Sequence, residues 1–153
     1  MKKISFIMTI CGLLLLAAGC KKGVEPDSII GNQPKPEWTA PADYDITASM
    51  TAVVAVDLSK SFSEERLAAA GFSLSTDDLI GAFSGDECLG TASLKEGLFY
   101  LFISAPKSGG GVWLKYYSAT LKNTFMAEPL PFKNDEQLGT VSAPYTPVWV
   151  VAN

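Results

Sequence analysis

The feature that most constrains the fold of this chain is an alternation of apolar and polar side chains between Tyr44 and Val56. Every even-numbered residue in this run is apolar, and most of the odd-numbered residues are polar. A period of two predicts a β-strand with one face on a core and the other in water. Because the run is long for a single strand, we expect a bend or bulge near Ser49.

The remainder of the domain consists of short apolar segments separated by turn residues. Gly85-Asp86 predicts a type II′ hairpin turn between two of them. One short helix is expected near 61–70, where Ser61 and Glu64 have the spacing of a capping box. This pattern predicts an all-β fold, an antiparallel Ig-like β-sandwich of about seven to eight strands with the helix inserted. Besides 44–56, the expected strands are 79–84, 87–94, 98–104, 112–118, 124–127, 138–141 and 148–151.

The N-terminus has the organisation of an export signal. Lys2 and Lys3 precede the apolar run 4–18, which is shorter than the roughly 20 residues that a membrane-spanning helix needs. The residues 16–20, Leu-Ala-Ala-Gly-Cys, resemble the lipobox of bacterial lipoproteins. This resemblance implies cleavage before Cys20 and attachment of lipid to its thiol. The alternative is an ordinary secretory signal with an incidental cysteine.

We therefore expect a signal peptide over 1–19, a flexible tether over 20–41 and a β-sandwich domain over 42–153. The tether carries charges, prolines and few apolar residues, a composition that buries too little surface to offset the entropy of ordering. Several acyl chains hold a protein firmly on a membrane. Lys21-Lys22 lacks the aspartate that retains some bacterial lipoproteins at the inner membrane. The expected location is the outer membrane, facing the surface or the periplasm.

Charge and cysteine content limit the classes of partner and fold. The chain has 12 basic and 16 acidic residues, and two of the lysines leave with the signal, so the mature domain is acidic. Binding to nucleic acid or to anionic lipid depends on Lys and Arg, so we expect neither. With Cys11 lost and Cys20 lipidated, Cys88 has no partner for a disulfide. Cys88 alternates with Gly90 and Ala92, which predicts a small buried side chain rather than a reactive thiol.

A set of short segments in the domain forms a recognisable pattern. The most specific is Gly-x-x-Cys-x-Gly at 85–90, preceded by Gly-Ala-Phe at 81–83, and further matches lie at 36–38, 50–54 and 138–140. The pattern resembles a small β-sandwich module of exported proteins and surface lipoproteins of Gram-negative gut bacteria. In related proteins this module accompanies glycan handling and adhesion at the cell surface, which the resemblance implies here as a setting.

The residue types argue against catalysis. The chain has no histidine, which removes Ser-His-Asp and Cys-His catalysis and the usual zinc ligands. Gly109-Gly110-Gly111 lacks the Lys-Ser or Lys-Thr of a phosphate loop. We therefore expect no enzyme, no catalytic residue and no cofactor. Four carboxylates flank the hairpin without the spacing of a calcium loop, so solvated loop charges are preferred over a metal site; they are Asp77, Asp78, Asp86 and Glu87.

The best candidate for a binding site is the segment 112–118, in which Trp113, Lys115 and Tyr117 share one face. Because Lys115 favours water, we expect this face to point outward and to expose Trp113 and Tyr117 roughly 13 Å apart, from about 3.3 Å per residue. Such a pair suits stacking on sugar rings and suits a protein partner equally. Alternatively, a second sheet or the C-terminal segment covers the two rings, with Trp38, Tyr145 or Trp149 as the covering residue.

These features together predict a membrane-anchored, non-catalytic binding module of the cell envelope. A glycan is the favoured ligand, and the alternative is a structural or adhesion module that binds another envelope protein. Exposed Trp113 and Tyr117 beside polar groups would favour the glycan. A larger apolar patch without such groups would favour a protein partner.

Overall fold

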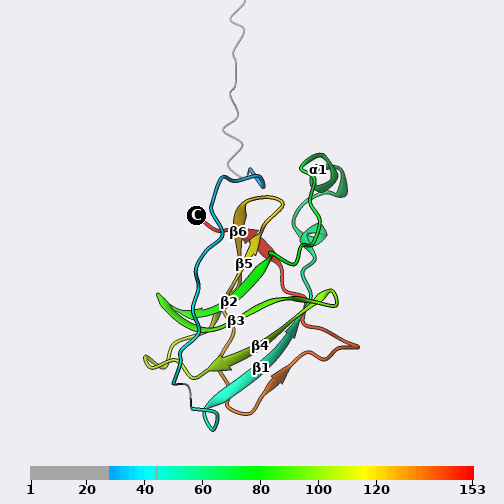
Figure 1. Cartoon of the computed structure of the whole chain (residues 1–153). Coiled ribbons are helices and arrows are strands. Elements are labelled where there is room, and N and C mark those ends of the chain that lie inside the picture. The colour runs from blue at the N-terminus through cyan, green and yellow to red at the C-terminus, as the bar shows by residue number, and fades with distance from the viewer. Residues whose placement is uncertain (1–27, 44) are drawn as a thin grey trace, which may run out of the picture.

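The structure, a computed structural model, describes residues 28–43 and 45–153 (Figure 1). The signal peptide 1–19, Cys20 and the first part of the expected tether lie outside these residues. The described part is mostly β, with one short α-helix, so the expected all-β class is confirmed. Its elements are β1 (Ser49–Val54), η1 (Leu58–Lys60), α1 (Glu64–Ala69), β2 (Leu79–Ser84), β3 (Glu87–Lys95), β4 (Leu98–Ser104), β5 (Trp113–Ser118), β6 (Asn123–Ala127), β7 (Gln137–Leu138) and β8 (Trp149–Val151).

The strands form one mixed sheet in the order β7-β1-β4-β3-β2-β5-β6-β8. The long strand β3 pairs with β2 over most of its length and with β4 only at its end, so it joins two halves of the sheet. These halves enclose the core between them, and Phe99 of β4 meets Tyr116 of β5 there at 6.1 Å. The two layers expected of a sandwich are therefore continuous here, as in a curled half-barrel. All pairs are antiparallel except β1 with β7.

The alternation of apolar and polar residues over 44–56 correctly predicts which side chains of β1 face the core. Its even-numbered side chains Met50, Ala52 and Val54 are buried in the core. The strand begins only at Ser49, however, and the expected extension back towards residue 44 is wrong over the described residues 45–48. There the Asp45 carboxylate accepts hydrogen bonds from the backbone N–H and the hydroxyl of Thr47, which stabilises a turn.

The hairpin between β2 and β3 forms at Gly85-Asp86 as predicted, with positive φ at Gly85. A bulge follows, because Phe83 pairs with Cys88 while Ala82 pairs with Gly90, which leaves Leu89 unpaired. The extra residue reverses the alternation of the strand. Leu89 therefore enters the core and Cys88 lies half-buried on the other face. The expectation of Cys88 as a buried core residue is wrong for this reason.

The C-terminal segment 137–151, which contains β7 and β8, forms both edges of the sheet. It pairs with β1 through β7 and again through Tyr145, which bridges to Val54. It then crosses to the other edge, where β8 pairs with β6. Trp149 of β8 is fully buried and packs on Tyr116 at 5.7 Å. The large apolar area of this ring is thus removed from water in the core.

The expected helix near 61–70 is present as α1 between β1 and β2, and Gly71 ends it with a φ of 71°. Its cap differs from the prediction. Ser63, rather than Ser61, accepts the hydrogen bond from the Arg66 N–H, while Ser61 terminates the preceding η1. Leu67 is the buried residue of the helix, so α1 attaches to the core by a single large side chain.

Residues 28–41, which we call the strap, lie against the sheet (Figure 1, blue). Ile29 is 3% exposed and belongs to the core. The N–H groups of Gly31 and Gln33 donate to the carbonyls of Leu121 and Lys122, in the turn between β5 and β6. The structure therefore differs from the flexible tether expected over 20–41, because its second part is held by backbone hydrogen bonds and by one core side chain.

Candidate functional site

The face predicted to bind a ligand is the outer face of β5. Leu114 and Tyr116 are fully buried in the core, so the alternate residues Trp113, Lys115 and Tyr117 lie on the opposite face. Trp113 and Lys115 are half-buried. The spacing of the three residues in the sequence thus places them together on the outside of the sheet.

The strap alters the exposure of this face. The Tyr117 hydroxyl donates to the carbonyl oxygen of Gln33 at 3.1 Å, and the side chain is only 4% exposed. Burial raises the pKa of Tyr117, with a smaller contribution from the charges of Asp78 and Asp77, so the phenol stays protonated as a donor. The expected exposed pair of Trp113 and Tyr117 is therefore wrong, because the strap covers Tyr117.

Trp38 of the strap lies over the neighbouring strand β2. Its ring meets the Phe83 ring edge-to-face, with centroids 5.2 Å apart. Gly81 permits this approach, since a Cβ atom there would come within 2.9 Å of the Trp38 ring. Of the three covering residues considered from the sequence, Trp38 is the one on this face, whereas Trp149 fills the core and Tyr145 pairs with β1.

The rings and the lysine form one connected group, the outer-face cluster of Trp38, Phe83, Trp113, Lys115 and Tyr117. Phe83 and Trp113 are direct cross-strand neighbours in the β2–β5 pairing. The Lys115 ammonium group lies 4.6 Å from the centre of the Phe83 ring. A cation over an aromatic face gains about 0.5–2 kcal/mol, depending on its desolvation. This contact holds the ammonium group over Phe83, the ring that both half-exposed indoles neighbour.

Trp38 is the member of the cluster that the sequence did not assign to the site. It was considered only as a residue that might pack on the domain or cover other rings. The available signal was Gly81, a residue without a side chain in an otherwise apolar strand, because such a glycine often marks the close approach of another group. Lys35 adds an exposed contact at 3.4 Å to Asp77, just before β2.

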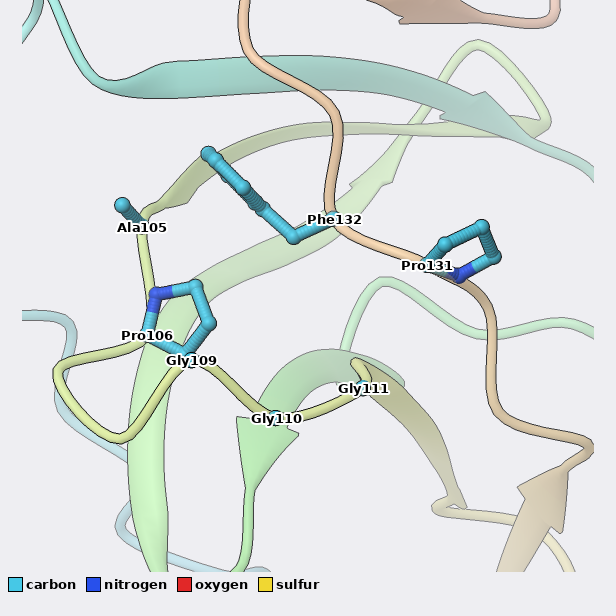
Figure 2. Close-up of a pocket in the computed structure, with 7 residues that line it drawn as sticks. All are labelled: Ala105, Pro106, Gly109, Gly110, Gly111, Pro131 and Phe132. Atoms are coloured by element: carbon cyan, nitrogen blue, oxygen red, sulfur yellow. The ribbon is translucent and has the colours of Figure 1, made fainter.

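A hollow of about 360 Å³ lies at one end of the sheet, between the β4–β5 loop and the segment before β7 (Figure 2). The Phe132 side chain points towards Ala105 across it, and the three glycines of the loop form an opposite wall of bare backbone. The wall thus offers one aromatic ring, proline rings and peptide groups, and no charged side chain. Its residues are Ala105, Pro106, Gly109, Gly110, Gly111, Pro131 and Phe132.

The four carboxylates around the hairpin are dispersed. Asp77 contacts Lys35, and the Glu87 carboxylate accepts the Lys107 N–H at 3.2 Å. Asp86 is exposed in the turn at the other end of β2. Across residues 28–43 and 45–153, no three His, Cys, Asp or Glu side chains are grouped as metal ligands would be.

Asp78 is the one fully buried carboxylate among these four. It accepts hydrogen bonds from the Tyr116 hydroxyl at 2.8 Å, from the Ser75 N–H at 3.0 Å and from the Ala119 N–H at 2.8 Å. Burial and the Asp78 charge raise the pKa of Tyr116 well above its ordinary value. Because all its partners are protein donors, Asp78 fastens the loop after α1 to the end of β5, which is a structural role.

Comparison with known proteins gives no relative: the chain matches no family model, and no curated protein or solved structure is significantly similar to it. Among the described residues, no helix is long and apolar enough to cross a membrane.

Proposed function

We propose that the chain is a lipid-anchored, non-catalytic binding module of the bacterial cell envelope, held at the outer membrane through Cys20, and that its ligand is a glycan. The observation that carries the glycan is the outer-face cluster, in which half-exposed Trp38 and Trp113 both neighbour Phe83, the ring over which the Lys115 ammonium group lies. Indole faces stack on the apolar faces of sugar rings, and an ammonium group donates hydrogen bonds to their hydroxyl or carboxylate oxygens.

The cluster also argues for binding rather than turnover. Its ionisable groups are one amine and one phenol, and the phenol already donates to the strap. Acid–base catalysis needs a group that exchanges a proton near the working pH, and neither side chain ordinarily does so. The arrangement can therefore hold a sugar by stacking and hydrogen bonding.

The direct test is a glycan array with the soluble chain 21–153, followed by affinity measurements on the Trp113→Ala variant. We expect the loss of a central aromatic contact to weaken binding by about tenfold or more. The matched control is Tyr100→Ala, because Tyr100 is a 40% exposed aromatic residue on β4, outside the cluster. Equal affinities of the two variants would refute this site. A large fall in the melting temperature of Trp113→Ala would show instead that Trp113 is structural.

Anchoring is tested independently of the ligand. Cys20→Ala should release the protein from the membrane fraction, because the acyl chains are the expected attachment. Continued membrane association of Cys20→Ala would refute lipid anchoring and leave the glycan proposal unaffected.

A protein partner remains the second candidate because of one edge of the sheet. Among the described strands β8 pairs only with β6, and Val148 and Val150 at this edge of the sheet are each 52% exposed. An exposed apolar edge can accept a strand from another protein. In that case Val150→Asp would abolish a cross-linked envelope complex while glycan retention stayed normal.

A further inference from the structure

The strap runs along the domain from one end to the other. At its start, Asn123 at the β5–β6 turn donates from its amide to the carbonyls of Ser28 and Ile29. At its far end, Pro41 and Asp43 line a hollow with Lys107 in the β4–β5 loop. The strap therefore runs the length of β5, and the glycine-lined hollow lies at the opposite end from Ser28.

The reach of the chain then limits the position of the anchor. Ser28 lies eight positions after Cys20. An extended chain spans at most about 3.5 Å per residue, which gives roughly 28 Å over these eight steps. Ser28 therefore stays within about 28 Å of a bilayer that holds the Cys20 lipid. The residues around Ser28 are thus kept near that bilayer in every orientation of the domain.

This end of the domain exposes apolar side chains. Ile30 is 54% exposed and Leu74 is 38% exposed. Leu74 belongs to the same end, because its neighbour Ser73 exchanges two hydrogen bonds with Thr120 in the β5–β6 turn. A hollow of about 220 Å³ separates Ile30 from α1 and is lined largely by apolar groups.

We propose that this end, formed by the start of the strap, α1, the loop that follows α1 and the β5–β6 turn, rests on the bilayer with Ile30 and Leu74 in the headgroup region. The inference rests on the lipid anchor of the proposed function. Burial of the two side chains adds only a weak contact with the bilayer, and the tether makes this contact effective by keeping the domain at the membrane surface. The glycine-lined hollow consequently opens away from the membrane, and the outer-face cluster lies along the side.

The test compares labels at the two ends of the lipidated full chain in phosphatidylethanolamine–phosphatidylglycerol vesicles. Cys88→Ala removes the other thiol, and an environment-sensitive fluorophore is attached through Leu74→Cys or, at the far end, through Ser108→Cys. We expect a doxyl-labelled lipid to quench the label at 74 at least about twofold more strongly than the label at 108. Equal quenching, or stronger quenching at 108, would overturn the orientation.

A second comparison keeps the label at position 74 and changes another residue, so that an effect of the label itself can be recognised. Ile30→Asp should reduce quenching of the label at 74, because a charged group resists entry into the interface. The matched control Ile46→Asp changes a 69% exposed isoleucine near the far end of the strap and should have no effect. If mass analysis found no acyl group on Cys20, the anchor itself would fail; an acylated protein with equal quenching at both positions overturns the orientation alone.

Discussion

The buried carboxylate of Asp78 allows a quantitative prediction for Asp78→Asn. The side chain is 0% exposed, and one oxygen accepts the Ala119 N–H while the other accepts the Ser75 N–H and the Tyr116 hydroxyl. An asparagine can offer an oxygen on one side only. Its NH₂ group must therefore face at least one N–H donor, and a donor without an acceptor costs about 1–3 kcal/mol.

The bonds that survive also weaken, since an acceptor without charge gains about 1 kcal/mol less per bond. Relief of the buried charge offsets part of this loss. We expect the free energy of unfolding to fall by about 3 kcal/mol, and the melting temperature by about 10 °C for a domain of this size. Urea unfolding followed by tryptophan fluorescence measures the difference.

Asp77→Asn is the matched control, because the neighbouring Asp77 side chain is 75% exposed and forms an ion pair with Lys35 at 3.4 Å. Exposed pairs of this kind contribute little to stability, so we expect a change below about 0.5 kcal/mol. If Asp78→Asn were no more destabilising than Asp77→Asn, Asp78 would not be the fastening of this loop.

Three further predictions concern buried groups. Burial raises the pKa of Tyr116, so as the pH rises the phenol ionises in the unfolded chain before it ionises in the folded one. The free energy of unfolding should therefore be constant below about pH 10 and fall above it by up to about 1.4 kcal/mol per pH unit. Urea unfolding at several pH values should show a smaller decline for Tyr116→Phe. Burial likewise raises the pKa of the Cys88 thiol, and an aromatic disulfide should label it about tenfold faster in urea than in the native chain 21–153. A methyl group at Gly90 would collide with the carbonyl oxygen of Phe102, so Gly90→Ala should lower the free energy of unfolding by at least about 3 kcal/mol, whereas Gly110→Ala should not.

Short patterns in the sequence predicted those parts of the fold that depend on interactions between residues close together in the chain. The alternation through Met50, Ala52 and Val54 identified the core face of β1, because a period of two is a property of the strand itself. The turn at Gly85-Asp86 followed from the need for a positive φ. The curl of the sheet did not follow, since it depends on β3 pairing with different neighbours along its length.

The errors at the site have one common cause, which is that the deciding contacts are long-range. The bulge at Leu89 turns Cys88 to the outer face, and no residue type in β3 announces it. The strap has the composition of a linker, yet Ile29 enters the core. The average composition of a segment does not show that two of its apolar side chains pack on the domain, as Ile29 does in the core and Trp38 does above Gly81.

The position of the domain boundary decides which rings the outer face of β5 exposes. A domain beginning at residue 42, as composition alone suggests, would lose the burial of Ile29, worth about 1.5–3 kcal/mol. It would also uncover Tyr117 beside Trp113 and so create the exposed pair that the sequence predicts. Binding by such a fragment would therefore describe a surface that the longer chain does not present. In the chain with its strap, Trp113 instead shares its neighbour Phe83 with Trp38, which is supplied by the segment that leads back towards Cys20.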